Sequence, residues 1–285
     1  MQLFHSTWSR TIFLLLGVLP SLAGLGYSFL YSVGGTGALS TGWTGQYWLS
    51  LVNDRAFWLS LGMSTLIALL VSLLSGWASI QIVLRWKSQL EPPWASSLLR
   101  LPMLFPPIVA AFIGYQWLSN SGLLARGAFL FGWIKEPEAF PALVNASNQL
   151  GIILTLLALQ LPLFCLFSWH QFKEAKLERY LELAAALGAS KWQQHWTIAV
   201  PILWSRMKPT MLLYGVFLFG AYEVPLVLGQ PYPGMLSVFL HTKFSRFNLQ
   251  DIPVAYAGTL VYALLVFGVT LYFFKTPKHQ RMSNG

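Results

Sequence analysis

Six long apolar stretches separated by short polar segments dominate the sequence. A helix that crosses the roughly 30 Å hydrocarbon core of a bilayer needs about 20 mostly apolar residues. No charged residue lies between Arg55 and Arg85 or between Asp251 and Lys275. The pattern predicts an all-α polytopic membrane protein with about six transmembrane helices, at residues 11–33, 56–84, 101–118, 149–169, 209–229 and 252–274.

Prolines mark the third and the fifth of these stretches in particular. The third contains Pro102, Pro106 and Pro107, and the fifth contains Pro225 close to Glu223. Proline inside a membrane helix is tolerated where neighbouring groups satisfy the backbone carbonyls that it frees. We therefore expect a bent and closely packed third helix and a broken fifth helix.

Lysine and arginine are distributed unevenly between the polar segments. With the N-terminus in the cytoplasm, 13 of the 18 basic residues fall on the cytoplasmic side and 5 on the opposite side. This excess is what the positive-inside rule requires. The sequence thus predicts a multi-pass protein of the bacterial inner (cytoplasmic) membrane with both termini cytoplasmic. The first apolar run is longer than the about 7–15 residues of a signal-peptide core, so we expect it to be retained.

Composition agrees with a membrane protein and excludes a soluble one. Hydrophobic residues make up 55% of the chain and charged residues only 9%, with a mean hydropathy of +0.57, whereas a soluble domain carries roughly 25% charged residues. The net charge of +9 does not indicate nucleic-acid binding, because the basic residues are spread between apolar runs and not clustered on one face. Cys165 is the single cysteine; it lies in an apolar run and is interpreted as a buried small hydrophobic residue.

The polar segment 173–208 differs from the other connections. Residues 174–187 are mostly strong helix formers, and Gly188 is expected to end this helix because glycine adopts the left-handed conformation without steric cost. Ser190 and Gln193 match the S-x-x-Q capping box, which begins a second helix. Pro201 is expected to end that helix, since the residue before a proline avoids the α region. The pattern predicts two short helices joined at a glycine corner.

Two roles are open for the second of these helices. With Trp192 and Trp196, it suits a helix that lies in a groove of a partner protein. The same tryptophans would also anchor a helix that rests on lipid headgroups. Periodicity favours neither role.

Residues of this segment resemble the EAA motif of ABC importer permeases: Glu182-Leu-Ala184, then Gly188, then Ile198-Ala-Val-Pro201. The spacing of the motif is kept throughout, and the departures are Leu183 for its first alanine and Val200 for its leucine. The resemblance extends to residues 101–111 and 220–229 and covers roughly residues 56–274, with the first helix as an addition. It implies an ABC importer type I permease-like fold in a single transmembrane domain over residues 1–285.

The resemblance also implies a function and a set of partners. The chain would be the membrane-spanning permease subunit of an ATP-driven importer and would form half of a translocation path. Its partners would be a second permease subunit, identical or different, two cytoplasmic ATP-binding subunits, a periplasmic or extracellular substrate-binding protein, and membrane lipid. The residues implied to contact the ATPase are Glu182, Ala184, Gly188, Ala189, Ile198 and Pro201.

No catalytic or cofactor site is expected in the chain itself. It contains no P-loop sequence G-x-x-x-x-G-K-[ST], so ATP and Mg would bind the partner ATPase and this chain would not be an enzyme. His170 and His195 have no second ligand at metal spacing, and we predict no metal site.

Three polar residues inside predicted spans are candidates for the translocation path. Glu223 is the only acidic residue well inside a span, and an ionisable group at that depth faces a bundle interior or a wet cavity. It either lines the path or makes a structural hydrogen bond near the outer surface. Tyr214 and Gln160 also lie in mid-span, where polar groups more often pack helices together.

Two other functional classes compete with the importer reading. A stand-alone ion-coupled secondary transporter commonly shows two related halves and several intramembrane charges, and neither is visible here. A membrane enzyme or assembly factor needs a cluster of polar residues at the bilayer edge, and none is visible. Outside the spans, the apolar stretch at residues 125–134 predicts a helix at the non-cytoplasmic surface of the same membrane.

Overall fold

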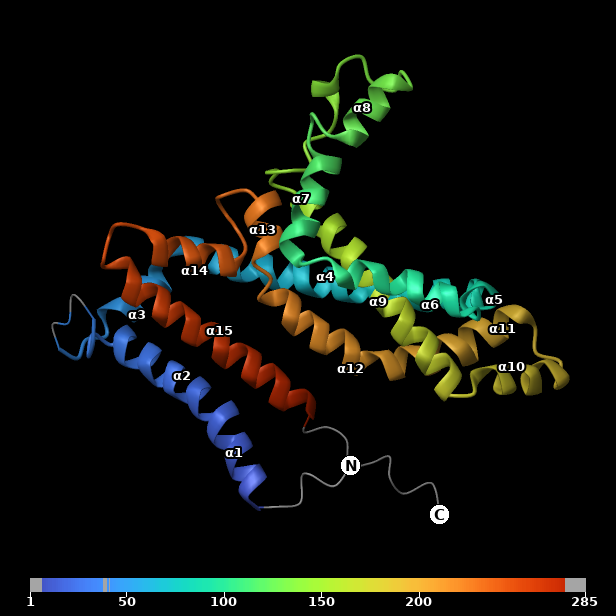
Figure 1. Cartoon of the computed structure of the whole chain (residues 1–285), viewed down its shortest axis with the longest axis horizontal. Coiled ribbons are helices and arrows are strands. Elements are labelled where there is room, and N and C mark those ends of the chain that lie inside the picture. The colour runs from blue at the N-terminus through green and yellow to red at the C-terminus, as the bar shows by residue number, and fades with distance from the viewer. Residues whose placement is uncertain (1–6, 38–39, 41, 275–285) are drawn as a thin grey trace. The chain divides into compact units, whose positions relative to one another are not determined.

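The computed structural model describes residues 7–37, 40 and 42–274 (Figure 1). Every regular element in these residues is a helix, which confirms the all-α prediction. The chain divides into two compact units, residues 1–59 with 239–285 and residues 60–238. The basic residues Lys275, Lys278 and Arg281, which contribute to the predicted orientation, lie outside the described residues.

Several described helices are long and apolar enough to cross a membrane. Four qualify: Thr11–Ser32, which combines parts of α1 (Thr7–Gly17) and α2 (Leu19–Ser32), α4 (Arg55–Arg85), α9 (Leu150–Glu174), and most of α15 (Asp251–Phe274). A fifth arises if the bent pair Pro93–Leu104 and Pro107–Leu130 is one span. The chain is therefore a polytopic membrane protein. Its described residues contain four to five such spans, where the sequence predicted about six.

The predicted third span, 101–118, is strongly bent. It consists of the 3-10 helix η1 (Leu101–Leu104) and α7 (Pro107–Leu118), and the helical segments on either side of the break make an angle of 93°. Phe105 precedes a proline and is extended, with ψ at 124°, because the proline ring excludes the helical conformation of the residue before it. The bend confirms the expectation drawn from the prolines.

The predicted fifth span, 209–229, is not one continuous helix. The structure has α12 (Val200–Phe219) and α13 (Glu223–Leu228), with non-helical residues between them. At the break, Gly220 N–H donates to Phe217 O at 3.2 Å and Ala221 N–H to Leu218 O at 3.0 Å, so the last turn tightens and the α-helical pattern stops. The break confirms the expectation of a broken helix near Glu223.

In the first unit, aromatic rings pack α2 against α15. Tyr256 of α15 contacts Tyr31 with ring centroids 4.6 Å apart and Tyr27 at 5.9 Å. Phe244 of α14 (Leu236–Ser245) meets the same ring edge-on at 5.0 Å. A short helix that the sequence did not predict, α3 (Gln46–Asn53), packs on α15 as well.

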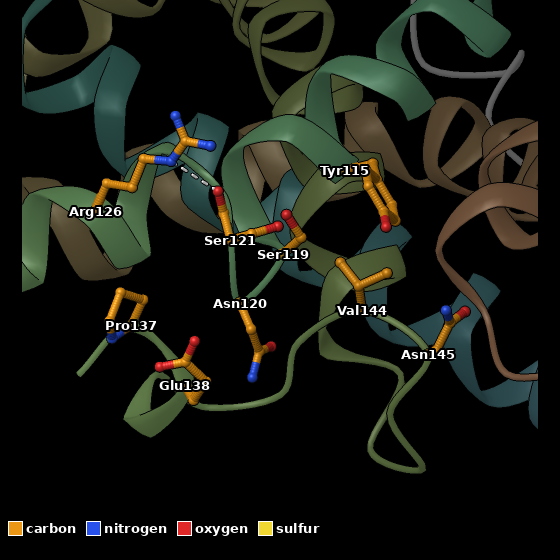
Figure 2. A pocket seen from close by; sticks show the side chains of 9 residues that line it. All are labelled: Tyr115, Ser119, Asn120, Ser121, Arg126, Pro137, Glu138, Val144 and Asn145. Atoms are coloured by element: carbon orange, nitrogen blue, oxygen red, sulfur yellow. Dashed lines mark hydrogen bonds between the residues drawn. The ribbon is translucent and has the colours of Figure 1, made fainter.

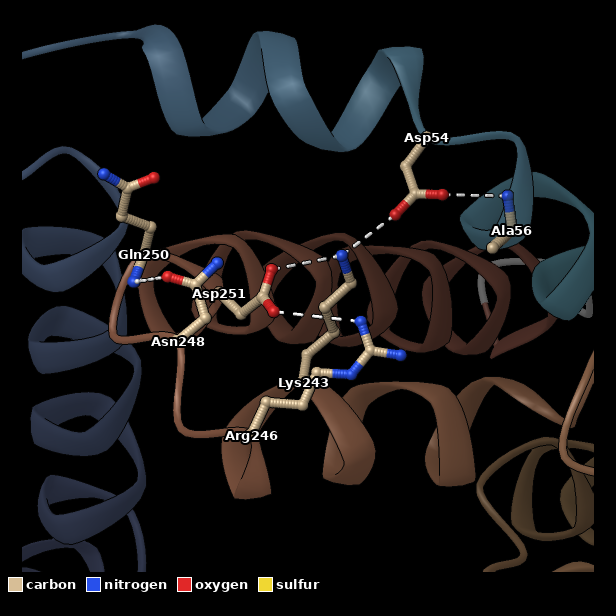
Figure 3. A network of polar contacts seen from close by, with 7 residues as sticks. All are labelled: Asp54, Ala56, Lys243, Arg246, Asn248, Gln250 and Asp251. Carbon is tan, nitrogen blue, oxygen red and sulfur yellow. Dashed lines mark hydrogen bonds and ion pairs between the residues drawn. The ribbon is translucent and has the colours of Figure 1, made fainter.

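A charged cluster joins three helix ends of the first unit (Figure 3). The Lys243 ammonium lies 3.1 Å from Asp54 Oδ2 and 3.3 Å from Asp251 Oδ1. Asp54 also accepts a hydrogen bond from Ala56 N–H at 2.9 Å and so caps α4. The side chains of Lys243, Asp54 and Asp251 are mostly buried, whereas Arg246, 3.8 Å from Asp251, is more than half exposed. The cluster is therefore centred on Lys243.

In the second unit, α4 presents a face of small residues to its neighbours. Ser72 Oγ donates to the Met211 carbonyl of α12, and Ser79 Oγ lies 2.9 Å from Ser168 Oγ of α9. A Cβ added at Gly76 would lie 2.1 Å from Met211 Cε. Small residues allow membrane helices to approach closely, and hydroxyl groups between them supply hydrogen bonds. The remaining elements of this unit are α5 (Lys87–Leu90), α6 (Pro93–Arg100), α8 (Leu123–Leu130), η2 (Pro137–Ala139), and α10, α11 and the π-helical η3 described below.

Replacing Lys243 by methionine should destabilise the protein by about 3 kcal/mol, because it leaves the mostly buried carboxylates of Asp54 and Asp251 without their cation. Thermal unfolding in detergent measures the effect. Arg246→Met is the matched control, and its effect should stay below about 1 kcal/mol because that side chain is exposed. Equal shifts for the two variants would contradict the central role of Lys243.

Replacing Gly76 by leucine should lower stability by about 1–3 kcal/mol, the usual cost of overpacking, because α12 must move away from α4. Gly62→Leu on the same helix is the control, since a Cβ at Gly62 meets nothing within 4 Å. The two melting temperatures are compared in the same detergent. If the Gly76→Leu protein is as stable as the Gly62→Leu protein, the prediction of overpacking is wrong, because the Met211 side chain then adopts another rotamer without cost.

Candidate functional site

The segment after α9 folds into a compact helical corner. α9 ends at Glu174, and α10 (Leu177–Ala186) begins after Lys176, which has a left-handed φ of 49°. The predicted helix over 174–187 therefore starts three residues late, because Glu174 completes the last turn of α9.

The corner itself is a Schellman motif. Gly188 has φ of 87°; its N–H donates to Ala185 O at 3.0 Å, and Ala189 N–H donates to Ala184 O at 2.9 Å. These two bonds satisfy carbonyls that the helix end leaves free. The role predicted for Gly188 as the end of the helix is confirmed.

The next helix begins with the predicted capping box. Gln193 N–H donates to Ser190 Oγ at 3.3 Å, and Ser190 N–H donates to Gln193 Oε1 at 2.9 Å. α11 (Lys191–Gln193) continues through the π-helix η3 (Gln194–Ala199) into α12. The prediction that Pro201 ends this helix is wrong. A π-turn contains one residue more than an α-turn, and it lies directly before Pro201, where a regular helix would need the N–H that proline lacks.

One side of the corner is fixed to the protein interior. Leu177 belongs to a buried cluster with Phe172, Ala199 and Leu203, and Ile198 packs against this cluster. α10 lies against η3 and the end of α9. The corner is therefore built onto the core of the second unit and is not an independent flap.

The other side is exposed and apolar. It carries Tyr180, Leu183 and Trp192, each more than half exposed, and Leu187, which is 89% exposed. We call these four residues the outer apolar face. Glu182, which precedes Leu183 on α10, is exposed and has no salt-bridge partner in the described part of the chain.

The six residues implied by the EAA resemblance divide between the two sides. The exposed ones are Glu182, Gly188 and Pro201, and the half-buried ones are Ala184, Ala189 and Ile198. All six lie on α10, the corner or the start of the following helices, so the structure gathers them in one region.

Polar contacts that the sequence did not predict connect the corner to other elements. Lys87 Nζ of α5 lies 2.9 Å from Glu178 Oε1 of α10. The hydrogen bond and the charge of Lys87, helped by Lys173, lower the pKa of the Glu178 carboxyl. His195 Nε2 of η3 lies 2.9 Å from Gln81 Oε1 of α4. These pairs are 91 and 114 residues apart in sequence, and no local pattern indicates them.

The three predicted path residues lie in different surroundings. Gln160 on α9 is 4% exposed, and neither atom of its amide has a hydrogen-bond partner in the described residues. Tyr214 on α12 packs edge-on against Phe164 with centroids 5.3 Å apart. Glu223 begins α13, is half-buried and has no salt-bridge partner among the described residues. No hydrogen bond or salt bridge among the described residues links the three side chains.

The remaining reactive residues form no site in the part of the chain that the structure describes. Cys165 is buried, as predicted. His170 Nε2 lies 3.9 Å from Glu174 Oε2 on the surface of α9. No group of three or more His, Cys, Asp or Glu among the described residues is placed to hold a metal ion.

Comparisons with known proteins agree on the fold. No protein-family model matches the sequence. A chain from the crystal structure of a bacterial alginate ABC transporter, in complex with an alginate pentasaccharide-bound periplasmic protein, superposes with a TM-score of 0.69 at 15% identity, covering 93% of this chain and 90% of that one. A chain from a bacterial ABC transporter involved in the import of the acidic polysaccharide alginate gives a TM-score of 0.69 and 15% identity over 94% and 91%. At this identity the shared property is the fold.

Replacing Gly188 by alanine should open the corner locally, because a left-handed conformation costs an L-residue about 1–2 kcal/mol. The added Cβ meets nothing within 4 Å, so the cost is confined to the backbone. Hydrogen exchange of the amides at positions 188 and 189 should accelerate roughly tenfold, since each 1.4 kcal/mol is a factor of about ten.

Gly127→Ala on α8 is the control, because its Cβ is also unobstructed and its φ lies outside the left-handed range. It should leave exchange at the corner unchanged. Unchanged exchange in Gly188→Ala would contradict the strained-corner argument.

Proposed function

We propose that this chain is the membrane-spanning permease subunit of an ATP-driven ABC importer. The observation that carries the proposal is the corner at Gly188. There the spacing of the EAA motif coincides with a capped helix pair that is anchored on one side and apolar and exposed on the other. The fold shared with chains of two ABC transporter structures supports it.

In this function the outer apolar face docks on a cytoplasmic ATPase subunit. Leu183, Leu187 and Trp192 supply apolar contact area, and the free carboxylate of Glu182 meets a basic residue of the ATPase. Gly188 supplies the turn. Charged contacts at the rim of an interface mainly select the partner and its orientation, so the apolar residues contribute most of the binding.

The anchored side of the corner transmits movement of the ATPase into the membrane. Because Leu177 and Ile198 pack into the same interior cluster as residues of α4, α9 and α12, a push on α10 reaches three helices of the second unit. Closure of two ATPases around ATP would move two such corners and switch the permease pair between inward and outward access. ATP and Mg would bind the ATPase subunits and not this chain.

The surrounding assembly follows from that role. Residues 1–285 would form one permease domain in the bacterial inner membrane with both termini cytoplasmic. A second permease subunit, identical or different, would complete the translocation path, and a periplasmic or extracellular binding protein would deliver the substrate. Lipid surrounds the helices, and no nucleic acid is involved.

Among the path candidates, the contacts favour Glu223. Its half-buried carboxylate follows a helix break and has no salt-bridge partner in the described residues. Broken membrane helices with irregular backbone commonly line cavities. Gln160 and Tyr214 pack inside the second unit, which favours a role in helix packing.

Co-purification from mild detergent with the cognate ATPase tests the proposal. Leu187→Asp should reduce the bound ATPase at least tenfold, because a charge is placed at the centre of an apolar contact. Phe247→Asp is the matched control: Phe247 is an equally apolar and fully exposed residue elsewhere in the chain, and its replacement should leave ATPase binding unchanged.

Two outcomes would contradict the proposal. If no nucleotide-binding subunit accompanies the wild-type protein under any condition, a stand-alone transporter becomes the better explanation. If both aspartate variants retain the ATPase, the docking site lies elsewhere than the outer apolar face.

A further inference from the structure

A second exposed apolar surface lies at α8. Leu130 at the end of this helix and Phe131 and Trp133 directly after it are each more than three-quarters exposed. The rings of Phe131 and Trp133 lie 5.7 Å apart. On the opposite side of α8, Ala125 and Ala128 are buried. We call Leu130, Phe131 and Trp133 the α8 tip.

The α8 tip belongs to the membrane face opposite the Gly188 corner. α9 has 25 residues and a length of about 37 Å, enough to cross the bilayer, and the corner follows its C-terminal end. The loop after α8 leads directly into the N-terminal end of α9, where Gly151 N–H donates to Leu143 O at 2.9 Å. Figure 1 shows α8 at the far end of α7, away from α4 and α9.

A pocket of about 450 Å³ is lined in part by residues of α8 and η2 (Figure 2). Arg126 of α8 and Glu138 of η2 line it together with Asn120, Asn145 and Tyr115. Arg126 Nε donates to Ser121 O at 2.9 Å, which fixes the guanidinium at the edge of the pocket. Neither Arg126 nor Glu138 has a salt-bridge partner in the described residues. The pocket therefore offers one free positive and one free negative group.

The combination of tip and pocket suits the membrane–water interface better than hydrocarbon or water alone. Hydrocarbon would solvate the tip but not the charges of Arg126, Lys135, Glu136 and Glu138. Water would solvate the charges but leave three large apolar side chains exposed together. The membrane–water interface accommodates both, since tryptophan, other apolar side chains and charged groups gather there.

We propose that the α8 tip inserts into the outer leaflet and that the adjacent pocket holds the headgroup of a zwitterionic phospholipid. The lipid phosphate accepts hydrogen bonds from the Arg126 guanidinium, whose planar fork matches phosphate oxygens. The ammonium group of a phosphatidylethanolamine lies toward the Glu138 carboxylate. The balance of two basic and two acidic residues in this region favours a zwitterionic over an anionic headgroup.

This inference is independent of the proposed transport function. The proposed site contains no residue of the Gly188 corner. Leu187 serves below only as a reference position for a label, and neither assay requires an ATPase or a substrate. Failure of one proposal leaves the other intact.

The first assay measures lipid that remains bound to the purified protein, by native mass spectrometry with phosphatidylethanolamine or phosphatidylglycerol supplied. Arg126→Gln should retain roughly tenfold less phosphatidylethanolamine, the usual effect of losing a hydrogen bond to a charged group. Lys135→Gln is the matched control, because it removes the same charge from the loop that follows α8, outside the pocket, and it should retain the lipid. Glu138→Gln should lose the preference for phosphatidylethanolamine over phosphatidylglycerol.

Retention of phosphatidylethanolamine by Arg126→Gln at the wild-type level would overturn the headgroup site. So would equal binding of the two lipids by the wild-type protein.

The second assay locates the α8 tip with a fluorophore on a single cysteine. Cys165 is the single cysteine, so Cys165→Ala supplies a cysteine-free background. In nanodiscs, a label on Trp133→Cys should be quenched by a lipid with a nitroxide near the headgroup, several-fold more than a label on Leu187→Cys. Iodide in the buffer should show the opposite order.

Quenching of the Trp133→Cys label by iodide as strong as that of the Leu187→Cys label would place the tip in water. Protection from both quenchers would place it against protein. Either result overturns membrane insertion of the tip.

Discussion

Backbone polar groups that leave a helix at membrane depth find no water, so the protein itself must supply their hydrogen-bond partners. Several backbone groups at irregular segments of the second unit have such a partner. At the break between α12 and α13, the Ala221 carbonyl accepts a hydrogen bond from Ser237. Leu236 N–H, which begins α14, donates to Ser64 Oγ at 2.7 Å, and the Leu228 carbonyl at the end of α13 accepts from Asn145 N–H at 2.8 Å.

The break before α7 meets the same requirement in another way. Pro106 and Pro107 have no N–H, so a chain that turns there leaves fewer donors to satisfy. The serine face of α4 then serves two purposes. It allows α12 to approach closely, and the hydroxyl groups of Ser72 and Ser79 bond to the Met211 carbonyl of α12 and the Ser168 hydroxyl of α9. Where a helix is interrupted, a polar group therefore satisfies the exposed backbone or a proline removes a donor.

The Gly188 corner shows how a rigid element can also be a docking surface. Its shape is fixed by two backbone bonds on one side of Gly188 and by the reciprocal cap at Ser190 on the other. Its attachment depends mainly on the buried Leu177, because an exposed pair such as Lys87 with Glu178 contributes little stability. Because these bonds and contacts already fix the corner, its exposed apolar side chains are not needed for its fold and can contact a partner. The α8 tip has a similar division, with small residues inside and large apolar residues outside, but its charged surroundings suit lipid headgroups.

The sequence by itself determined the features that depend on neighbouring residues. Long uncharged runs predicted the α4 and α15 spans, and Gly188 and the Ser190–Gln193 pair predicted a corner whose bonds reach only three to five residues along the chain. Tertiary structure alone decided the features that depend on distant partners. Ser64 meets Leu236 across 172 residues, and Lys243 lies between Asp54 and Asp251 only because three helix ends converge. The prediction that Pro201 ends its helix failed for a related reason. The local rule for prolines predicts a helix end there, but the π-turn in η3 lets the helix continue. A hydrogen bond between His195 and Gln81 connects η3 to the distant helix α4. Local hydrogen bonds can be read from spacing, whereas pairings between distant segments exist only after the helices have packed.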